Sequence, residues 1–321
     1  MPDFAFGAFV VEAAFLGDTA AFALGDGTVR LVDDSGERTA TVHAGAILAA
    51  TPTVDNRMLT GGDDGRVVLT RADGVTAVVA ERPRKWIDLV AAGPNGAVAY
   101  AAGRQSFVRL ADGRERTFDH DRAVGGLAFA PKGVRLVVAR YGGVTLWWAG
   151  TEAPPVALDW PGAHFAPTVS PDGRYVVTAM QENALHGWRL DDRKDMRMSG
   201  YPAKPKSLSW SVKGRFLASS GADVAILWPF HFKDGPMGRQ PLQLGAREAA
   251  VTRVACHPRE EVVAVGYKDG MVLAVRFADA EEALLRKPGA GPVSALAWNA
   301  AGRRLAVGTE EGAAAVIDLA G

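Results

Sequence analysis

Histidine, cysteine and acidic side chains are the residues of this chain that could build a metal centre or a catalytic site. Zinc sites need clustered ligands, in motifs such as C-x-x-C or H-x-x-x-H. The histidines stand far apart along the chain, at His43, His120, His164, His186, His231 and His257. We therefore predict that they are structural or solvated, and that the protein binds no metal and no other cofactor.

The candidates for a nucleophile are equally sparse. The single cysteine, Cys256, follows Val254 and Ala255, and a free cysteine in an apolar segment usually has a buried, inert thiol. A single cysteine excludes an internal disulfide and indicates a reducing compartment. The sequence has no G-x-S-x-G elbow, phosphate loop or dinucleotide fingerprint. These observations predict a protein that is not an enzyme.

The charge balance bears on the partners. Lys plus Arg and Asp plus Glu number 36 each, so no net field favours nucleic acid or an anionic membrane. The apolar N-terminal segment contains Asp3 and Glu12 and no basic residue, which is unlike a signal peptide, and it is too short to span a bilayer. We expect a cytoplasmic protein that binds neither nucleic acid nor membrane.

Two series of turns recur along the chain at intervals of about 40 residues. The first series comprises Gly17-Asp18, Asp55-Asn56, Asn95-Gly96, Lys132-Gly133, Asp172-Gly173, Lys213-Gly214, Arg259-Glu260 and Ala301-Gly302. The second comprises Asp26-Gly27, Asp64-Gly65, Arg104-Gln105, Gly142-Gly143, Glu182-Asn183, Ala222-Asp223, Asp269-Gly270 and Glu311-Gly312. Between them lie strand-like runs such as that from Tyr175 to Met180. The chain is therefore a tandem repeat of strand–turn–strand–turn–strand units.

The repeats resemble those of the WD40-repeat β-propeller family over the whole chain. Ser170-Pro171-Asp172-Gly173 matches the family's S-P-D-G motif. Other family positions are kept in single repeats: the tryptophan at Trp148, Trp188 and Trp228, the following aspartate at Asp33 and Asp318, and the G-H histidine at His43 and His120. No repeat keeps both the tryptophan and the aspartate, so the resemblance is to a member with degenerate repeats.

This resemblance implies an all-β fold, a β-propeller of four-stranded blades. Eight turn pairs predict eight blades, with seven, the family's commonest number, as the alternative. The modules fill the chain and leave room for one domain only: residues 9–43, 44–85, 86–122, 123–164, 165–203, 204–249, 250–291 and 292–321.

Two features of the chain depart from the repeat. The last module ends after its third strand, so we expect the N-terminal segment Asp3–Phe6 to supply the fourth strand and close the ring. The sixth module carries an insertion at Pro229–Pro241, which we place between its third and fourth strands.

A candidate binding face follows from the predicted propeller. In such a fold the turns between second and third strands share one face with the links that lead to the next blade. Side chains expected there are Arg84, Trp86, Arg104, Tyr141, Gln181, Lys206, Tyr267 and Lys268. Trp, Tyr and Arg are enriched at interface hot spots.

The other aromatic residues have structural interpretations. Trp148, Trp188 and Trp228 are predicted to be buried, because large aromatics supply much of the buried area. Trp160 and Tyr201 stand at the G-H position and would fill the space of the absent histidine.

Two functions fit these features. The first is a non-catalytic scaffold, a monomer outside any complex, that binds a protein or peptide partner through one face. The alternative is an enzyme or small-molecule binder that uses the central channel. The alternative would need Asp, Glu or His at the starts of the first strands, where the sequence has Ile87, Ala123, Val251 and Pro292. The scaffold is therefore favoured.

Overall fold

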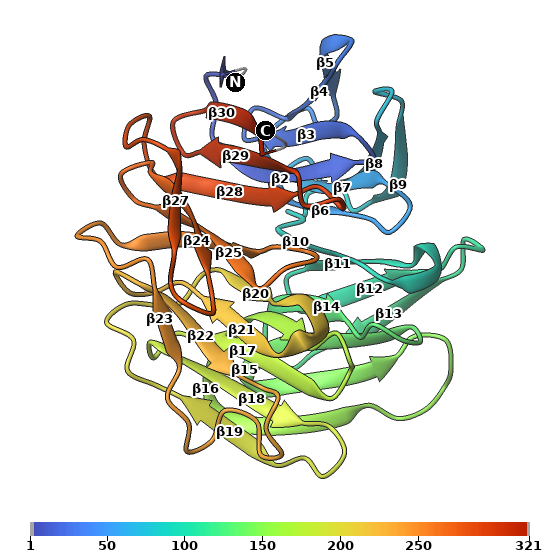
Figure 1. Cartoon of the computed structure of the whole chain (residues 1–321). Coiled ribbons are helices and arrows are strands. Elements are labelled where there is room, and N and C mark those ends of the chain that lie inside the picture. The colour runs from blue at the N-terminus through green and yellow to red at the C-terminus, as the bar shows by residue number, and fades with distance from the viewer. Residues whose placement is uncertain (1–2, 320–321) are drawn as a thin grey trace.

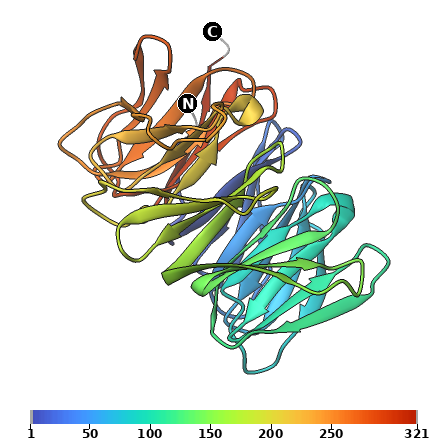
Figure 2. The ribbon, with the colours of Figure 1, turned by 90° about the horizontal axis from the view of Figure 1, so that it is seen from below.

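The chain forms antiparallel sheets arranged in a ring, which is a β-propeller (Figure 1). The structure, a computed structural model, describes residues 3–319. Two short 3-10 helices, η1 (Pro94–Gly96) and η2 (Val212–Gly214), lie in turns between first and second strands. The colour passes from blue to red around the ring, and the blue and red parts lie side by side in Figure 1 and, from below, in Figure 2.

The first three sheets have four strands each, in sequence order. The first contains β2 (Val10–Leu16), β3 (Thr19–Leu24), β4 (Thr28–Asp33) and β5 (Gly36–Thr41). The second contains β6 (Ile47–Pro52), β7 (Arg57–Gly62), β8 (Arg66–Arg71) and β9 (Thr76–Glu81). The third contains β10 (Leu89–Ala92), β11 (Val98–Ala102), β12 (Gln105–Arg109) and β13 (Glu115–Asp119).

Three further four-stranded sheets complete the other side of the ring. One contains β20 (Leu208–Trp210), β21 (Phe216–Ser219), β22 (Ala225–Pro229) and β23 (Leu242–Leu244). The next contains β24 (Val251–Cys256), β25 (Val262–Tyr267), β26 (Val272–Arg276) and β27 (Glu282–Arg286). The last contains β28 (Val293–Trp298), β29 (Arg304–Thr309), β30 (Ala313–Asp318) and β1 (Asp3–Ala5).

The remaining sheet has six strands and corrects the expected blade number. It contains β14 (Val124–Phe129), β15 (Arg135–Trp148), β16 (Val156–Val169), β17 (Tyr175–Met180), β18 (Ala184–Arg189) and β19 (Asp195–Met198). It takes up the two predicted modules 123–164 and 165–203. Counted as hydrogen-bonded sheets, the propeller has seven blades, and the prediction of eight separate four-stranded blades is wrong.

The reason lies in the two long strands, β15 and β16, which have 14 residues each. Elsewhere a loop such as residues 82–88 separates one sheet from the next, whereas residues 160–163 stay within β16. Tyr141 pairs with Ala163, so the ladder continues from one module into the next. A link too short to leave the ladder therefore joins two modules into one sheet.

This six-stranded sheet is folded back on itself. The strands β14 and β16 approach closely although β15 lies between them in hydrogen-bonding order. A Cβ atom on Gly125 would stand 2.3 Å from the carbonyl oxygen of His164, and one on Gly126 would stand 2.3 Å from Cδ of Pro167. Buried side chains of β15, among them Leu146, pack with Trp188 of β18. The two halves of the sheet thus pack together as neighbouring sheets do elsewhere in the ring.

The N-terminal strand closes the ring, as predicted. Asp3 pairs with Ala315 and Ala5 with Ala313, so β1 becomes the outer strand of the last sheet. The rings of Phe4 and Phe6 stack with centroids 5.6 Å apart, and Phe6 lies 5.5 Å from Phe22 of the first sheet. Hydrogen bonds and apolar packing therefore hold the two ends of the described chain together.

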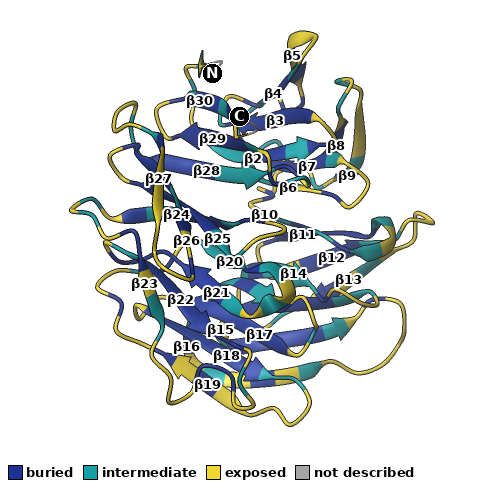
Figure 3. Cartoon of the chain, in the orientation of Figure 1, coloured by how far each residue is buried: buried dark blue, intermediate teal, exposed yellow. Residues whose placement is uncertain are grey.

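The core lies between neighbouring sheets. Leu59 and Val67 of the second sheet, for example, pack with Tyr100 and Phe107 of the third. The second and third strands of the sheets, such as β3, β11 and β22, are the most buried. Several innermost strands, such as β6, β14 and β20, are mostly half-buried, and Figure 3 shows the outer strands β5, β9, β13 and β27 largely exposed. Apolar packing between neighbouring sheets thus forms the core of the propeller.

The insertion lies between β22 and β23, as predicted. Its first residue after β22, Phe230, is buried and packs edge-on against Tyr175 and Trp210, with centroids 5.0 and 4.8 Å away. Asp234, further along, lies 3.5 Å from the guanidinium of Arg189. The insertion therefore covers the outer edge of the preceding sheet.

Candidate functional site

The turns between second and third strands and the links between sheets lie together, and we call this surface the link face. Backbone hydrogen bonds tie each link to a turn. The amide of Arg82 donates to the carbonyl of Gly65 at 2.7 Å. The amides of His120 and Lys268 donate in the same way to Arg104 and Ala250, each at 2.9 Å. These bonds hold the loops of the link face in place.

Seven of the eight side chains expected on this face are exposed: Arg84, Trp86, Arg104, Tyr141, Gln181, Lys206 and Lys268. Trp86 is 70% exposed and Tyr141 is 61% exposed. Among the Trp, Tyr and Phe side chains of residues 3–319, no other reaches these values. Two large aromatic surfaces are therefore open to a partner on the link face.

Tyr267 is the exception, and its expected surface position is wrong. The side chain is fully buried, and its hydroxyl donates to the carbonyl oxygen of Gly245. Tyr267 is the last residue of β25, so it still points into the space between two sheets, beside Leu273 and Val275. The turn that reaches solvent begins one residue later, at Lys268.

The expected burial of the tryptophans is correct for Trp188 and Trp228 and wrong for Trp148. Trp148 is 38% exposed, with the guanidinium of Arg135 4.8 Å above its ring. It ends β15, and the preceding residue Trp147 packs on Phe118 instead, with centroids 4.5 Å apart. The packing position is thus shifted by one residue in this repeat.

Histidines, and a tyrosine that replaces one of them, form polar contacts inside the sheets. The two ring nitrogens of His43 lie 2.9 Å from Asp64 Oδ1 and 2.9 Å from Thr60 Oγ1. His164 Nδ1 lies 2.7 Å from Thr178 Oγ1.

Tyr201, near the end of the fifth predicted module, takes the corresponding place beside the strands of the sixth. Its hydroxyl lies 2.6 Å from Ser219 Oγ and accepts a hydrogen bond from Trp228 Nε1 at 2.7 Å. Tyr201 therefore fills the place of the absent histidine, as predicted. Trp160, the other residue predicted there, stacks on His186 with centroids 4.1 Å apart.

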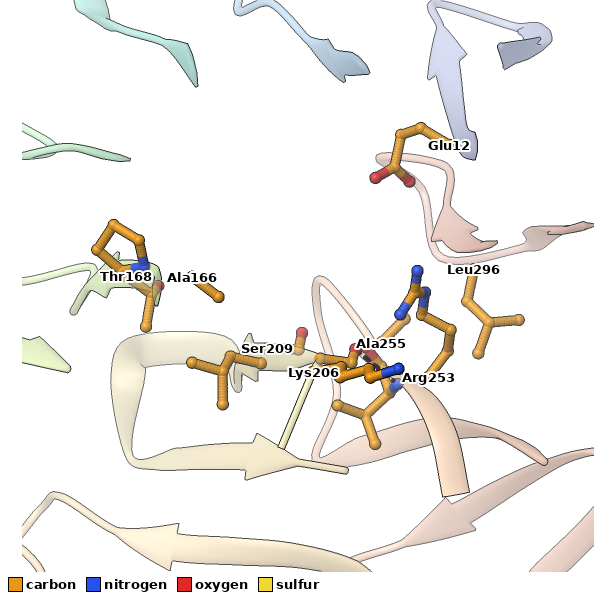
Figure 4. A pocket seen from close by; sticks show the side chains of 12 residues that line it. Glu12, Ala166, Thr168, Lys206, Ser209, Arg253, Ala255 and Leu296 are labelled. Carbon is orange, nitrogen blue, oxygen red and sulfur yellow. Dashed lines mark hydrogen bonds between the residues drawn. The ribbon is translucent and has the colours of Figure 1, made fainter. Parts of the chain in front are cut away.

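A cavity of about 430 Å³ lies among the first strands, which contact one another around the centre of the ring (Figure 4). Its polar lining consists of Glu12, Thr168, Lys206, Ser207, Ser209 and Arg253. Lys206 belongs to the link before β20, so the cavity lies next to the link face.

The side chain of Glu12 is half-buried, and it lines this cavity. Burial raises the pKa of its carboxyl to about 7, although a hydrogen bond from the amide of Ala13 and the charge of Arg253 both lower it. Arg253 is anchored by a hydrogen bond from Nε to the carbonyl of Ser294. Its guanidinium and the ammonium of Lys206 lie on the side of the cavity across from Glu12 in Figure 4.

Glu12 and Arg253 are functional candidates that the sequence analysis does not single out, because a structural feature places them in the channel. Five first strands carry a register shift near their start, and each of these two residues directly follows one. The equivalent positions elsewhere are Ala49, Gly126 and Ala295. We had considered strand starts such as Val251, two residues before the position that lines the channel.

The described residues contain neither a cluster of metal ligands nor a membrane-spanning helix. Within residues 3–319, no three His, Cys, Asp or Glu side chains come together in a way that could hold a metal ion. No helix in that range has the length and apolar character needed to cross a bilayer.

Comparison with known proteins identifies the fold. The chain is similar to the crystal structure of the computationally designed Ika8 protein, with a TM-score of 0.77 and 20% sequence identity. The alignment covers 98% of this chain and 97% of the Ika8 chain. This protein is a β-propeller with repeated blades. No family model matches the sequence, and no curated protein matches it.

Proposed function

We propose that this protein is a degenerate WD40-type propeller that acts as a non-catalytic scaffold and binds a protein or peptide through the link face. The exposure of Trp86, in an anchored link, and of Tyr141, in β15, on that face carries the proposal. Exposed aromatic side chains on rigid loops lose little conformational entropy on binding, and each can contribute about 2 kcal/mol or more.

The polar contacts inside the sheets support the WD40 part of the proposal. His43, Thr60 and Asp64 reproduce three of the four members of the family's His–Ser/Thr–Asp–Trp set. Tyr201 and Ser219 take the places of His43 and Thr60, and the hydroxyl of Tyr201 also accepts a hydrogen bond from Trp228, which stands at the tryptophan position of its repeat.

Charge on the link face favours a protein partner over nucleic acid. Exposed basic residues such as Arg84 and Lys268 alternate with the exposed acidic residues Asp88, Asp121 and Asp269. A phosphate backbone needs an uninterrupted basic surface, whereas a protein interface tolerates mixed charge. We propose that the protein works in the cytoplasm, as a monomer when it is outside its complex.

The test is partner capture by a Trp86→Ala/Tyr141→Ala double variant. A matched control is Val54→Ala/Met237→Ala, which removes exposed apolar side chains from turns of the opposite face. We expect the first variant to lose captured partners, or to weaken an isolated partner's affinity by about 30-fold per hot-spot residue. The control should bind as wild type. If both variants melt as wild type and capture the same proteins, the proposal is wrong.

A further inference from the structure

We infer that the cavity at the centre of the ring is a binding site for a small organic carboxylate that also carries an amino or hydroxyl group. This site is independent of the link-face aromatics. Three charged side chains from separate parts of the chain meet in its wall: Glu12 on β2, Lys206 in the link before β20, and Arg253 on β24 (Figure 4). Charged groups brought together in a partly enclosed cavity favour a ligand that pairs with them.

These charged groups do not satisfy one another. Among the ion pairs of residues 3–319, none joins Glu12 to Arg253 or to Lys206. One oxygen of Glu12 accepts the amide of Ala13 at 3.0 Å, and its other oxygen is open to the cavity. Arg253 uses Nε on Ser294 and Nη1 on the carbonyl of Thr252 at 3.4 Å, which leaves Nη2 free. A ligand can therefore reach both a donor and an acceptor.

The net charge of the cavity wall determines whether the ligand is an anion or a cation. Two cations face one carboxyl, and the raised pKa of that carboxyl leaves part of it uncharged near neutral pH. The net charge of the lining is positive, and low-dielectric walls strengthen its field. A guanidinium presents paired donors that match the two oxygens of a carboxylate. The ligand is therefore an anion, held by Arg253 with Lys206 beside it.

Glu12 and the apolar part of the wall further restrict the chemical class of the ligand. A carboxylate oxygen open to the cavity accepts a hydrogen bond, so the ligand carries a donor, which an amino or hydroxyl group supplies. A phosphate dianion would meet the Glu12 carboxyl with like charge. Leu208, Val254 and Leu296 form an apolar part of the wall. A volume of about 430 Å³ suits a small molecule with a short hydrocarbon part.

The experiment measures binding of defined probes to the purified full chain by ligand-observed NMR. The probes are L-leucine and lactate, with leucinamide, lactamide, acetate and inorganic phosphate as comparisons. We expect the two donor-bearing carboxylates to bind. Their amides lack the negative charge and acetate lacks the donor, so each of these should bind at least about tenfold more weakly.

The variants locate the site. Arg253→Met should weaken binding by at least about tenfold, and Lys206→Ala, an exposed position that leaves the fold intact, by about threefold. Arg303→Met, which removes an exposed guanidinium elsewhere, should bind as wild type. A thermal melt of each variant checks folding.

Three results would overturn the inference. The first is that neither carboxylate binds at about 10 mM. The second is that folded Arg253→Met and Lys206→Ala variants bind as wild type. The third is that phosphate binds more tightly than either carboxylate. Because the probes are small molecules and Trp86 and Tyr141 stay intact, failure here leaves the proposed scaffold function untouched.

Discussion

Glu12→Gln removes a buried acid without changing the size of the side chain, so it isolates the effect of the carboxyl on stability. Burial raises the folded-state pKa of Glu12 from an ordinary value of 4.5 to about 7. A carboxyl with a raised pKa binds more protons in the folded state than in the unfolded state. Stability therefore falls as pH rises from about 4.5 to about 7, and the loss is complete above that window.

The magnitude follows from the two pKa values. A difference of about 2.5 pKa units corresponds to about 3.4 kcal/mol, and about 2.5 kcal/mol of it develops between pH 5 and pH 8. These are upper limits, because the carboxyl faces a cavity that admits water. We expect Glu12→Gln to gain stability relative to wild type by up to this amount when both are moved from pH 5 to pH 8.

The assay is urea unfolding of wild type and variant at both pH values, with the exposed Asp34→Asn as control. The control should follow wild type at each pH. If the stability difference between Glu12→Gln and wild type changes by less than about 0.5 kcal/mol between pH 5 and pH 8, Glu12 does not titrate in the buried environment described here.

Three further predictions test the packing. Tyr267→Phe leaves the buried carbonyl of Gly245 without its donor, so urea unfolding should show a loss of about 1–2 kcal/mol, whereas the exposed Tyr141→Phe should unfold as wild type. Deleting residues 3–6 uncovers the edge of β30, and we expect a lower melting temperature together with dimers or aggregates on size-exclusion chromatography. Phe230→Ala should cost about 3–5 kcal/mol in the same unfolding assay, well above the partly exposed Phe232→Ala; equal effects would show that the insertion does not cover the sheet edge.

Most of the fold could be predicted from the repeat. Each pair of turns marks one strand–turn–strand unit, and this holds for any side chains that lie between the turns. The closing strand could also be predicted, since the last module lacked a fourth strand and Asp3–Ala5 was the available segment. The prediction of eight separate blades is wrong because residues 160–163 join two predicted modules into one sheet. Turn spacing counts modules, but whether two modules share a ladder depends on the length of the link, and this one stays within β16 despite a register shift.

The residues of the candidate site could be predicted from the sequence only in part, for a related reason. Trp86 lies in a link between sheets, where position along the repeat predicts exposure. Tyr141 lies in β15, at the irregularity in the ladder that precedes Gly143. Tyr267 stands one residue before a turn, and the alternation of a strand, not its nearness to the turn, decides where its side chain points. Glu12 and Arg253 reach the channel because a register shift precedes each of them, and such shifts have no single sequence signature.

The pairing of Asp3 with Ala315 means that the ring cannot close before β30 has been synthesised. At about 5–20 residues per second, a ribosome needs about 15 to 60 s to reach β30 after β1 has been made. For that interval the nascent chain carries an unsatisfied strand at each end, and both can recruit neighbouring chains on a polysome. Slower translation therefore lengthens the time for which β1 stays without its partner strand.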